Sequence, residues 1–146
     1  MSNKILSQAT YQAAMIQSQA YRALANFMNK QLGEFQLSLS EWKVLGHLNE
    51  SNVMTPSEIS KLLNVKSPIS SRLLKTLGAK GLLTRRKDKT DNRIFHITIT
   101  PEGRGLVASV EKRLRASMKQ FLADVDSNDL ENYLKVLNLI AHKIEA

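Results

Sequence analysis

The chain has 146 residues, which is enough for one domain with a hydrophobic core, or for one small domain with an appended helical module. It contains no cysteine, which excludes disulfides, thiolate metal sites and cysteine-based redox switches. Because the sequence has no apolar run as long as a membrane span and its N-terminus lacks a secretory signal, we expect a cytoplasmic protein that does not contact a membrane.

The positive charge is concentrated in one segment. The formal net charge is +8, and residues 55–100 carry ten lysines and arginines against three acids, so this segment alone holds +7. A solvated surface without a charged partner usually mixes the two signs along the chain. The concentration therefore favours an anionic partner such as a nucleic acid backbone or an anionic membrane.

Two helices are predicted in the first 50 residues. Apolar side chains recur at spacings of three and four over residues 4–32, without a proline or an interior glycine. The second helix is expected to run to about Glu50, with Ser38 or Ser40 as its N-cap and Glu41 in its first turn.

A short third helix has strong boundary signals. Thr55 and Glu58 have the spacing of a reciprocal capping box, and Pro56 stands at the first helical position, where its missing N–H costs nothing. The predicted helix runs from Pro56 to about Leu63.

A fourth helix repeats the pattern directly afterwards. Ser67 is the expected cap, Pro68 the first helical residue and Gly81 the left-handed residue near the end. Because about four residues join the two short helices, the sequence predicts a helix-turn-helix.

The fourth helix has an apolar and a polar face. At 100° per residue, Ile69, Leu73 and Leu77 cluster on one side, and Ser70 and Leu74 lie near the same core side. The polar side would fit the major groove of DNA. The candidate DNA contacts of this helix are Lys66, Ser67, Pro68, Ser71, Arg72 and Lys75. Arg72 is the best candidate for a guanine edge, because its guanidinium can donate to both O6 and N7.

After this helix the apolar period changes from 3.6 to 2. Residues 82–86 and 94–100 are rich in branched and aromatic side chains and predict two strands, with Phe95, Ile97 and Ile99 on one face of the second. A hairpin that follows a helix-turn-helix is the wing of a winged helix. The candidate DNA contacts of the wing are Arg85, Arg86, Lys87, Lys89, Asp91 and Arg93.

Two more helices complete the prediction. Thr100 should cap a fifth helix that starts at Pro101 and ends near Ala123, and a sixth helix follows residues 124–129. The first and sixth helices contain too many hydrophobic residues for isolated surface helices, so we expect them to be buried against a partner chain.

The sequence therefore predicts a mainly α protein with a small β-hairpin wing, in the α+β class. We expect one unit, in which residues 35–100 form a winged helix-turn-helix domain. Residues 1–34 and 101–146 would form a helical dimerisation region.

These motifs resemble, in order and spacing, the MarR (multiple-antibiotic-resistance regulator) family of bacterial transcription factors. The most specific pieces are "SRLLKTLGAKGLLTRR" and the Asp91-x-Arg93 pair, followed by a strand and "TPEG". The resemblance covers nearly the whole chain. It implies a homodimer whose first, fifth and sixth helices interlock, with each recognition helix in a major groove and each wing in the adjacent minor groove.

The resemblance also implies roles for single residues. Arg93 would be the wing arginine in the minor groove, Asp91 would orient it, and Ser71 and Arg72 match the family's recognition-helix pattern. Lys75 stands where the family often has an acid, and Asn92 stands where it often has arginine. The base preference and the wing contacts are therefore expected to differ from those of other members.

The expected function is that of a sequence-specific DNA-binding transcriptional regulator. We expect a homodimeric repressor that a small-molecule effector releases from a pseudo-palindromic operator. The family commonly senses anionic aromatic compounds, oxidants through cysteine, or zinc. The chain lacks cysteine, and His47, His96 and His142 are far apart, so a small molecule such as an anionic aromatic is the expected effector, with no cofactor or metal.

Two other functions compete with this prediction. A winged module that mediates protein assembly without DNA would keep the fold but would not need a wing arginine or a basic face. An enzyme would need a catalytic motif, and the sequence has no glycine-rich phosphate loop, serine elbow, metal motif or convincing pair of carboxylates.

Overall fold

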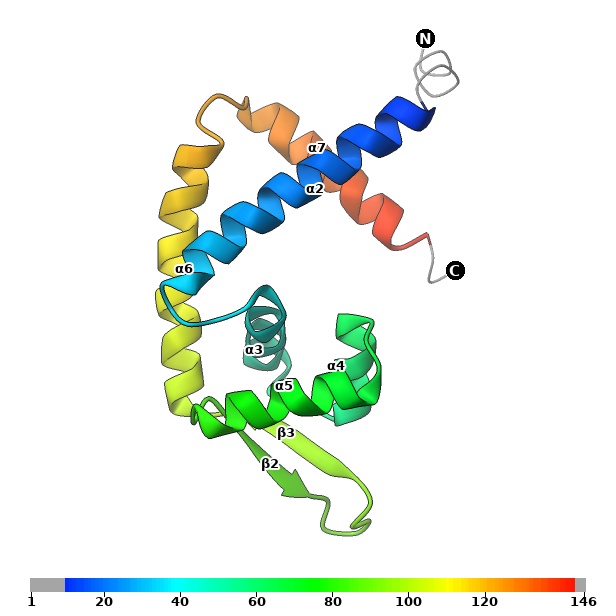
Figure 1. Cartoon of the computed structure of the whole chain (residues 1–146), viewed down its shortest axis with the longest axis vertical. Helices are drawn as coiled ribbons and strands as arrows, with labels where there is room; N and C mark the ends of the chain where they lie inside the picture. Colours follow the sequence, from blue (N-terminus) through cyan, green and yellow to red (C-terminus); the bar gives the residue numbers. More distant parts are fainter. Residues whose placement is uncertain (1–9, 144–146) are drawn as a thin grey trace. The chain divides into compact units, whose positions relative to one another are not determined.

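The structure is a computed structural model and describes residues 10–143. In chain order the elements are α2 (Thr10–Gly33), α3 (Leu39–Ser51), β1 (Val53–Met54), α4 (Pro56–Leu63), α5 (Ser67–Ala79), β2 (Leu83–Lys87), β3 (Phe95–Ile99), α6 (Pro101–Phe121) and α7 (Ser127–Ala141) (Figure 1). The predicted fold class is confirmed. Residues 4–9 of the first predicted helix lie outside the described residues.

The chain divides into two compact units, Met1–Lys112 and Arg113–Ala146. Helix α6 begins in the first unit and ends in the second. No helix within residues 10–143 has the length and apolar character needed to cross a membrane.

The capping boxes fix where α3 and α4 begin. The Ser38 hydroxyl accepts from the Glu41 amide at 3.1 Å, and the Glu41 carboxylate accepts from the Ser38 amide at 2.8 Å. Ser38, and not Ser40, is therefore the cap of α3. Thr55 and Glu58 form the predicted box at the start of α4, so two of the free amides at that end are paired.

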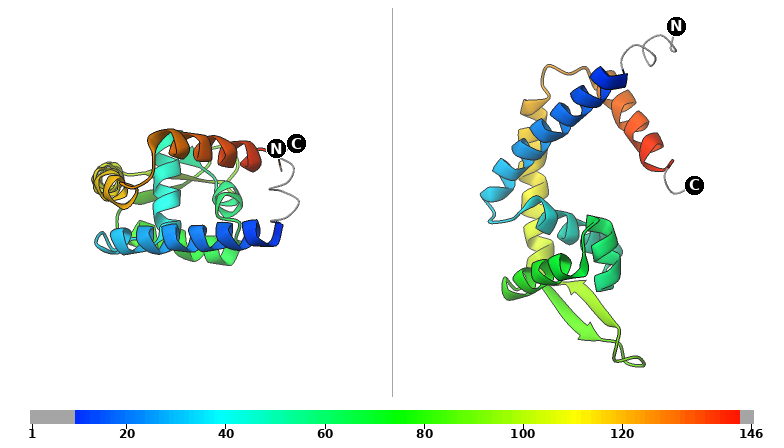
Figure 2. Two further views of the ribbon diagram at one scale, coloured as in Figure 1. Left: turned by 90° about the horizontal axis from the view of Figure 1, so that it is seen from above. Right: turned by 45° about the vertical axis from the view of Figure 1, so that its right-hand side comes forward.

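The sheet has one more strand than the sequence predicts. Strand β3 pairs with β2 on one side and with β1 on the other, both antiparallel. Both predicted strands are confirmed as β2 and β3. Strand β1 was not predicted, because its two residues are too few to show a period-2 pattern. The β2–β3 hairpin projects beyond α5, as expected for a wing (Figure 2).

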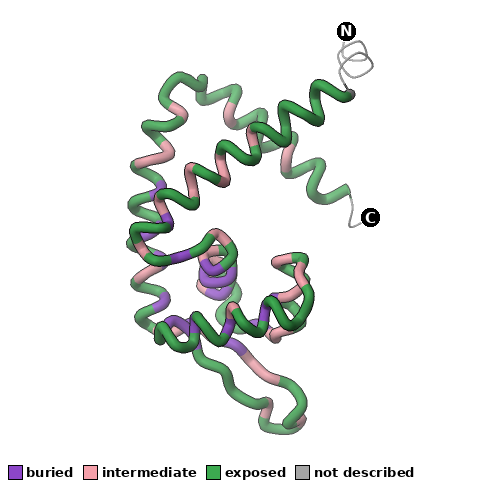
Figure 3. Tube along the Cα trace, viewed as in Figure 1, coloured by how far each residue is buried: buried purple, intermediate pink, exposed green. Residues whose placement is uncertain are grey.

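The core of the first unit lies where α3 and α4 pack on β3 and α5 packs on α4 and β2. Leu45, Leu48, Ile59, Leu77 and Ile97 have no exposed surface. Figure 3 shows buried stretches on the helices and at the base of the hairpin, whereas the distal hairpin is exposed or partly exposed. The core therefore fixes α5 and leaves the wing in solvent.

Helix α5 differs from the prediction at its start. Lys66 is the N-cap, without a side-chain hydrogen bond, so Ser67 is the first helical residue and Pro68 the second. The expectation that Ser67 caps this helix is wrong. The helix ends at Ala79, and Gly81 has a positive φ of 73°, the left-handed conformation that glycine adopts most easily.

The apolar side of α5 is also rotated relative to the prediction. Ser70, Leu74 and Leu77 are buried, whereas Ile69 is 58% exposed. Ser70 can be buried because its hydroxyl lies 2.6 Å from the Ser60 hydroxyl of α4 and donates to the Ser67 carbonyl at 3.1 Å. The assignment of Ile69 to the core is therefore wrong.

The hairpin is attached tightly to the start of α6. The Thr100 hydroxyl donates to the Gly81 carbonyl at 2.7 Å and accepts from the Gly103 amide at 3.0 Å. A Cβ atom on Gly103 would lie 2.3 Å from the Leu82 carbonyl oxygen and 2.7 Å from Cγ1 of Ile99. Only glycine fits at this position without displacing the backbone.

Helix α7 in the second unit is capped by Asp126, whose carboxylate accepts from the amides of Asn128 and Asp129. None of its residues is buried. Leu134 is 55% exposed and Leu139 is 61% exposed, although leucine is normally a core residue. The preceding helix, α6, ends at Phe121, two residues before the predicted end.

Candidate nucleic-acid interface

The exposed face of α5 carries positive charge without internal partners. Arg72 and Lys75 are exposed on the side opposite the buried Ser70, Leu74 and Leu77. Neither cation forms an ion pair within residues 10–143. Lys66, Ser67, Pro68 and Ser71 are exposed as well, so the predicted candidates on this helix share one accessible surface. Their charges are available to an outside anion.

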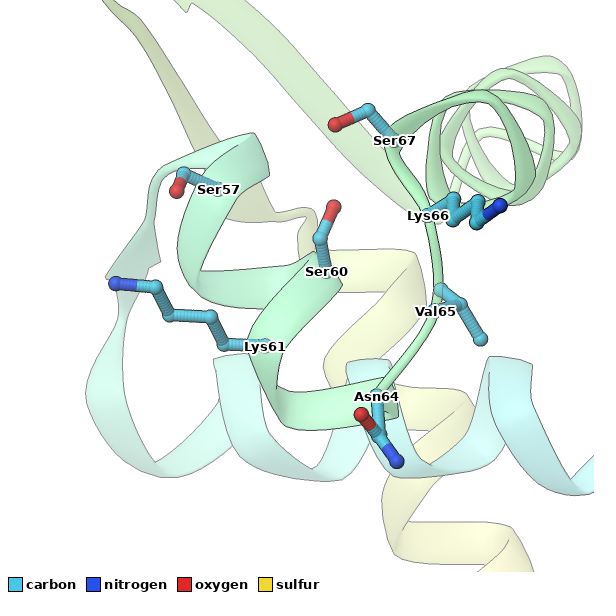
Figure 4. A pocket seen from close by; sticks show the side chains of 7 residues that line it. All are labelled: Ser57, Ser60, Lys61, Asn64, Val65, Lys66 and Ser67. Carbon is cyan, nitrogen blue, oxygen red and sulfur yellow. The ribbon is translucent and has the colours of Figure 1, made fainter.

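An open polar cleft lies between α4 and the turn into α5. It has a volume of about 480 Å³, and its lining includes Ser57, Ser60 and Ser67 (Figure 4). The hydroxyls of Ser60 and Ser67 lie near each other, Ser57 lies farther away on the first turn of α4, and Lys61 and Lys66 extend outward on the two sides. Within the described part of the chain, the hydroxyls of Ser57 and Ser67 form no hydrogen bond. This arrangement suits an oxyanion such as a phosphate, and the sequence reading did not identify Ser57.

A second cavity lies between α5 and the base of the wing. It has a volume of about 360 Å³ and is lined on one side by Ser71 and Lys75 and on the other by Arg85. The Arg85 guanidinium lies 3.7 Å from the centroid of the Phe95 ring, a cation–π contact. Arg85 therefore faces α5 at the base of the hairpin and does not lie at its tip.

Asp88 organises the turn of the wing. One of its carboxylate oxygens accepts from the Thr90 amide at 2.8 Å, the Thr90 hydroxyl at 2.7 Å and the Asp91 amide at 3.0 Å. The other oxygen lies 2.8 Å from Nε2 of His96. These hydrogen bonds, first that of the Thr90 side chain and then that of His96, hold the pKa of Asp88 well below its usual range. The sequence reading gave Asp88 no role, although its spacing to Thr90 is that of an Asx-turn.

Asp91 holds Arg93 in one orientation. Its Oδ1 accepts from the Arg93 amide at 2.9 Å and from Nε at 3.1 Å, and its Oδ2 accepts from Nη2 at 3.3 Å. The Arg93 side chain is still 91% exposed. The Arg93 side chain, followed by its backbone amide, lowers the pKa of Asp91. The wing thus presents an oriented guanidinium whose carboxylate partner stays ionised.

The remaining cations of the basic segment are placed differently from one another. Arg86 pairs across the sheet with His96, on the opposite face from Arg85 and Lys87. Lys89 is exposed in the wing turn. Lys80 pairs with other residues of the protein: its Nζ lies 3.2 Å from the Glu41 carboxylate and donates to the Gln36 carbonyl at 2.7 Å. One of the ten cations is therefore structural.

Residues 10–143 contain no group of three or more His, Asp and Glu side chains that could hold a metal ion.

Sequence comparison identifies the family. The MarR family profile matches residues 37–95, the stretch from the start of α3 to the wing. The regulator TcaR of Staphylococcus aureus, described as an HTH-type transcriptional regulator, is 33% identical over 126 residues, which cover 84% of this chain and 83% of TcaR. The chain belongs to the MarR family of winged helix-turn-helix transcriptional regulators.

Solved MarR-family structures share the fold. A mutant MarR of Escherichia coli in complex with operator DNA superimposes with a TM-score of 0.79 at 17% identity, over 92% of this chain and 97% of that one. The DNA-binding regulator BpsR of Bordetella bronchiseptica, described with 6-hydroxynicotinic acid, gives a TM-score of 0.78 at 18% identity, over 89% of this chain and 98% of that one. In this MarR-family chain, α5 takes the place of the recognition helix and the β2–β3 hairpin that of the wing.

Proposed function

We propose that the protein is a homodimeric transcriptional repressor that binds a pseudo-palindromic operator and is released from it by a small-molecule effector. One observation carries the DNA-binding part of the proposal. The guanidinium of Arg93 is held by Asp91 and almost fully exposed near the end of the hairpin, and Arg72 and Lys75 of α5 form no ion pair with any residue from 10 to 143. A winged module that mediates protein assembly without DNA would not need an oriented wing arginine or a basic face on α5.

The recognition helix and the wing would make different contacts. Helix α5 has 13 residues, about 20 Å at about 1.5 Å per residue, and would lie in a major groove about 12 Å wide. Arg72 would donate to O6 and N7 of a guanine, and Ser71 would bond a base edge or a phosphate. Arg93 would enter the adjacent minor groove, where a narrow groove has a strongly negative potential.

Phosphate contacts would fix the position of the helix. In a helix-turn-helix the first helix crosses the DNA backbone. The free hydroxyls of Ser57 and Ser67 in the cleft beside α4, with Lys61 and Lys66 on its flanks, suit one backbone phosphate. Lys89 in the wing turn would contribute a further contact with the backbone.

The exposed apolar side chains support a dimer. Helix α7 exposes Leu134, Val136 and Leu139 by half or more, and α2 exposes Ile16 and Tyr21 to a similar degree. Such surfaces are costly in water unless a partner covers them, and a two-fold homodimer covers the same patch on both copies. A two-fold protein in turn binds two-fold DNA, with half-site centres about 10–10.5 bp apart.

The effector part of the proposal is supported by the relative BpsR, whose DNA binding is described as regulated by 6-hydroxynicotinic acid. An anionic aromatic compound is therefore the first class to test.

The test of the proposed function is selection from a pool of random-sequence duplexes, followed by sedimentation of the free protein. We expect one enriched pseudo-palindrome and a species of about twice the 16.4 kDa chain mass. Replacing both Leu134 and Leu139 by glutamate should yield a monomer with weak operator binding. A pool without enrichment, or a wild-type monomer at micromolar concentration, would contradict the proposal.

A further inference from the structure

Ile69 is an apolar side chain on a polar surface. It is 58% exposed, the most exposed large hydrophobic residue of the basic segment, ahead of Ile94 at 42% and Leu62 at 37%. Single exposed apolar side chains are common and by themselves indicate nothing. Ile69 is considered further because of its position on α5, next to the face that carries Arg72.

Ile69 borders the face that carries Arg72. At 100° per residue, Arg72 lies about 60° from Ile69, whereas the buried Ser70 lies about 100° away in the other direction. Ser71 and Lys75 lie on the opposite flank of Arg72 and line the cavity toward Arg85 of the wing. Ile69 therefore forms the edge of the recognition face that points away from the wing.

The major groove contains one apolar group that such a side chain can recognise. Thymine presents its C5-methyl group there, and the other three bases present hydrogen-bonding groups without a methyl. A branched aliphatic side chain that covers this methyl removes apolar surface of both partners from water. A cytosine or purine at the same place would leave Ile69 against a polar edge.

We infer that Ile69 is a specificity-determining residue that contacts the methyl group of a thymine close to the guanine bound by Arg72. This inference rests on the proposed function. Residues three apart on a helix have Cβ atoms about 5–6 Å apart, which corresponds to one or two base steps of about 3.4 Å. The thymine is therefore expected within about two base pairs of that guanine.

The test uses the selected operator with single base-analogue changes made symmetrically in both half-sites. Replacing thymine by uracil removes the methyl and leaves base pairing unchanged. Replacing guanine by 7-deazaguanine locates the Arg72 contact, because Arg72→Ala should be insensitive at that position. Wild-type affinity should fall by about three- to fivefold per half-site at one thymine, as expected for one methyl-sized group.

The matched variants show whether Ile69 is responsible. Ile69→Ala should lose the uracil effect at that thymine, Ile69→Val should keep part of it, and Val53→Ala, a similarly exposed apolar residue on β1, should keep all of it. Circular dichroism should show that each variant is folded.

The inference is overturned if wild type and Ile69→Ala respond alike to uracil at every position, or if the affected thymine lies more than about three base pairs from the guanine. Either result leaves operator binding intact. Absence of any selected operator would instead contradict the proposed function, and this inference with it.

Discussion

The recognition helix and the wing both carry exposed arginines, but they differ in how firmly neighbouring groups hold the arginine side chain. Arg93 of the wing is fixed by three hydrogen bonds to Asp91, and the turn before it is fixed by those to Asp88. Arg72 of α5 has no ion-pair partner among the residues that the structure describes, and the first turn of its helix contains no acid and no side-chain cap. A fixed guanidinium suits a minor groove, which is recognised by its shape and potential, whereas a free one can adjust to a base edge.

The largest expected effect concerns Arg72. If the free guanidinium bonds a guanine, Arg72→Ala should cost about 1–3 kcal/mol per half-site on the operator and much less on random DNA. Arg72→Lys keeps the charge but cannot form the bidentate hydrogen bond. Compared with Arg72→Ala, it should therefore restore binding to random DNA without restoring the preference for the operator over random DNA. Fluorescence anisotropy with both duplexes measures this. If Arg72→Ala lost the same affinity for the operator and for random DNA, Arg72 would contribute only its charge.

The next effect concerns Arg93 and the sequence that flanks the half-sites. Arg93→Ala should weaken binding by a similar order, most strongly where the flanks are A·T-rich and their minor groove is narrow. Exchanging those flanks for G·C should therefore weaken the wild type more than the variant. If both lose the same affinity on exchange, the wing does not sense groove width.

A smaller effect separates orientation from charge in the wing. Asp91→Ala makes the protein more positive, yet it releases the Arg93 guanidinium and should weaken operator binding by about threefold to tenfold, less than the loss of Arg93 itself. Asp124→Ala, which removes an exposed acid outside the wing, is the matched control and should leave affinity nearly unchanged. Tighter binding by Asp91→Ala would show that net charge governs the wing.

The contribution of Lys89 should be smaller and independent of sequence. Lys89→Ala should weaken binding to operator and random duplexes alike, and should lower the magnitude of the salt slope by about one per subunit, as expected for one phosphate contact. The measurement is affinity at several salt concentrations. An effect confined to the operator would instead assign Lys89 to base recognition.

The smallest effect concerns stability at low pH. Because the folded-state pKa of Asp88 is lower than in the unfolded chain, its contribution is complete above the ordinary aspartate pKa, near 4, and is lost as the pH falls below that value. Between about pH 5 and pH 3, the urea midpoint of wild type should therefore fall more than that of Asp88→Ala. Asp124→Ala should follow wild type, and an equal fall for Asp88→Ala would contradict the assignment.

Local signals in the sequence were sufficient for most of the fold. The Thr55 and Glu58 box, the Pro56 start and the left-handed Gly81 depend on a few adjacent residues, and the structure confirms them. Strand β1 was missed because a two-residue strand exists only through its pairing with β3, which no local pattern records.

The site was predicted less completely, for a related reason. At 100° per residue Ile69 falls beside Leu73 and Leu77 and was therefore placed in the core, but it is exposed. Ser70, which the same periodicity put near the core side, is buried, and its hydroxyl lies within hydrogen-bonding distance of the Ser60 hydroxyl of α4. Lys80 counted toward the basic segment, yet it pairs with Glu41 more than 30 residues earlier. The contacts of Ser70 with Ser60 and of Lys80 with Glu41 join residues that are distant in sequence, and periodicity does not identify such partners.

The close contact at Gly103 has a mechanical consequence. The first turn of α6 lies against the Leu82 carbonyl at the root of the hairpin, and Thr100 bonds both sides of the joint. With no space for a side chain there, the hairpin and the start of α6 cannot bend independently. A tilt of the start of α6 would therefore rotate the hairpin with it as one body. The turn that carries Arg93 lies farthest from this joint and would move the greatest distance.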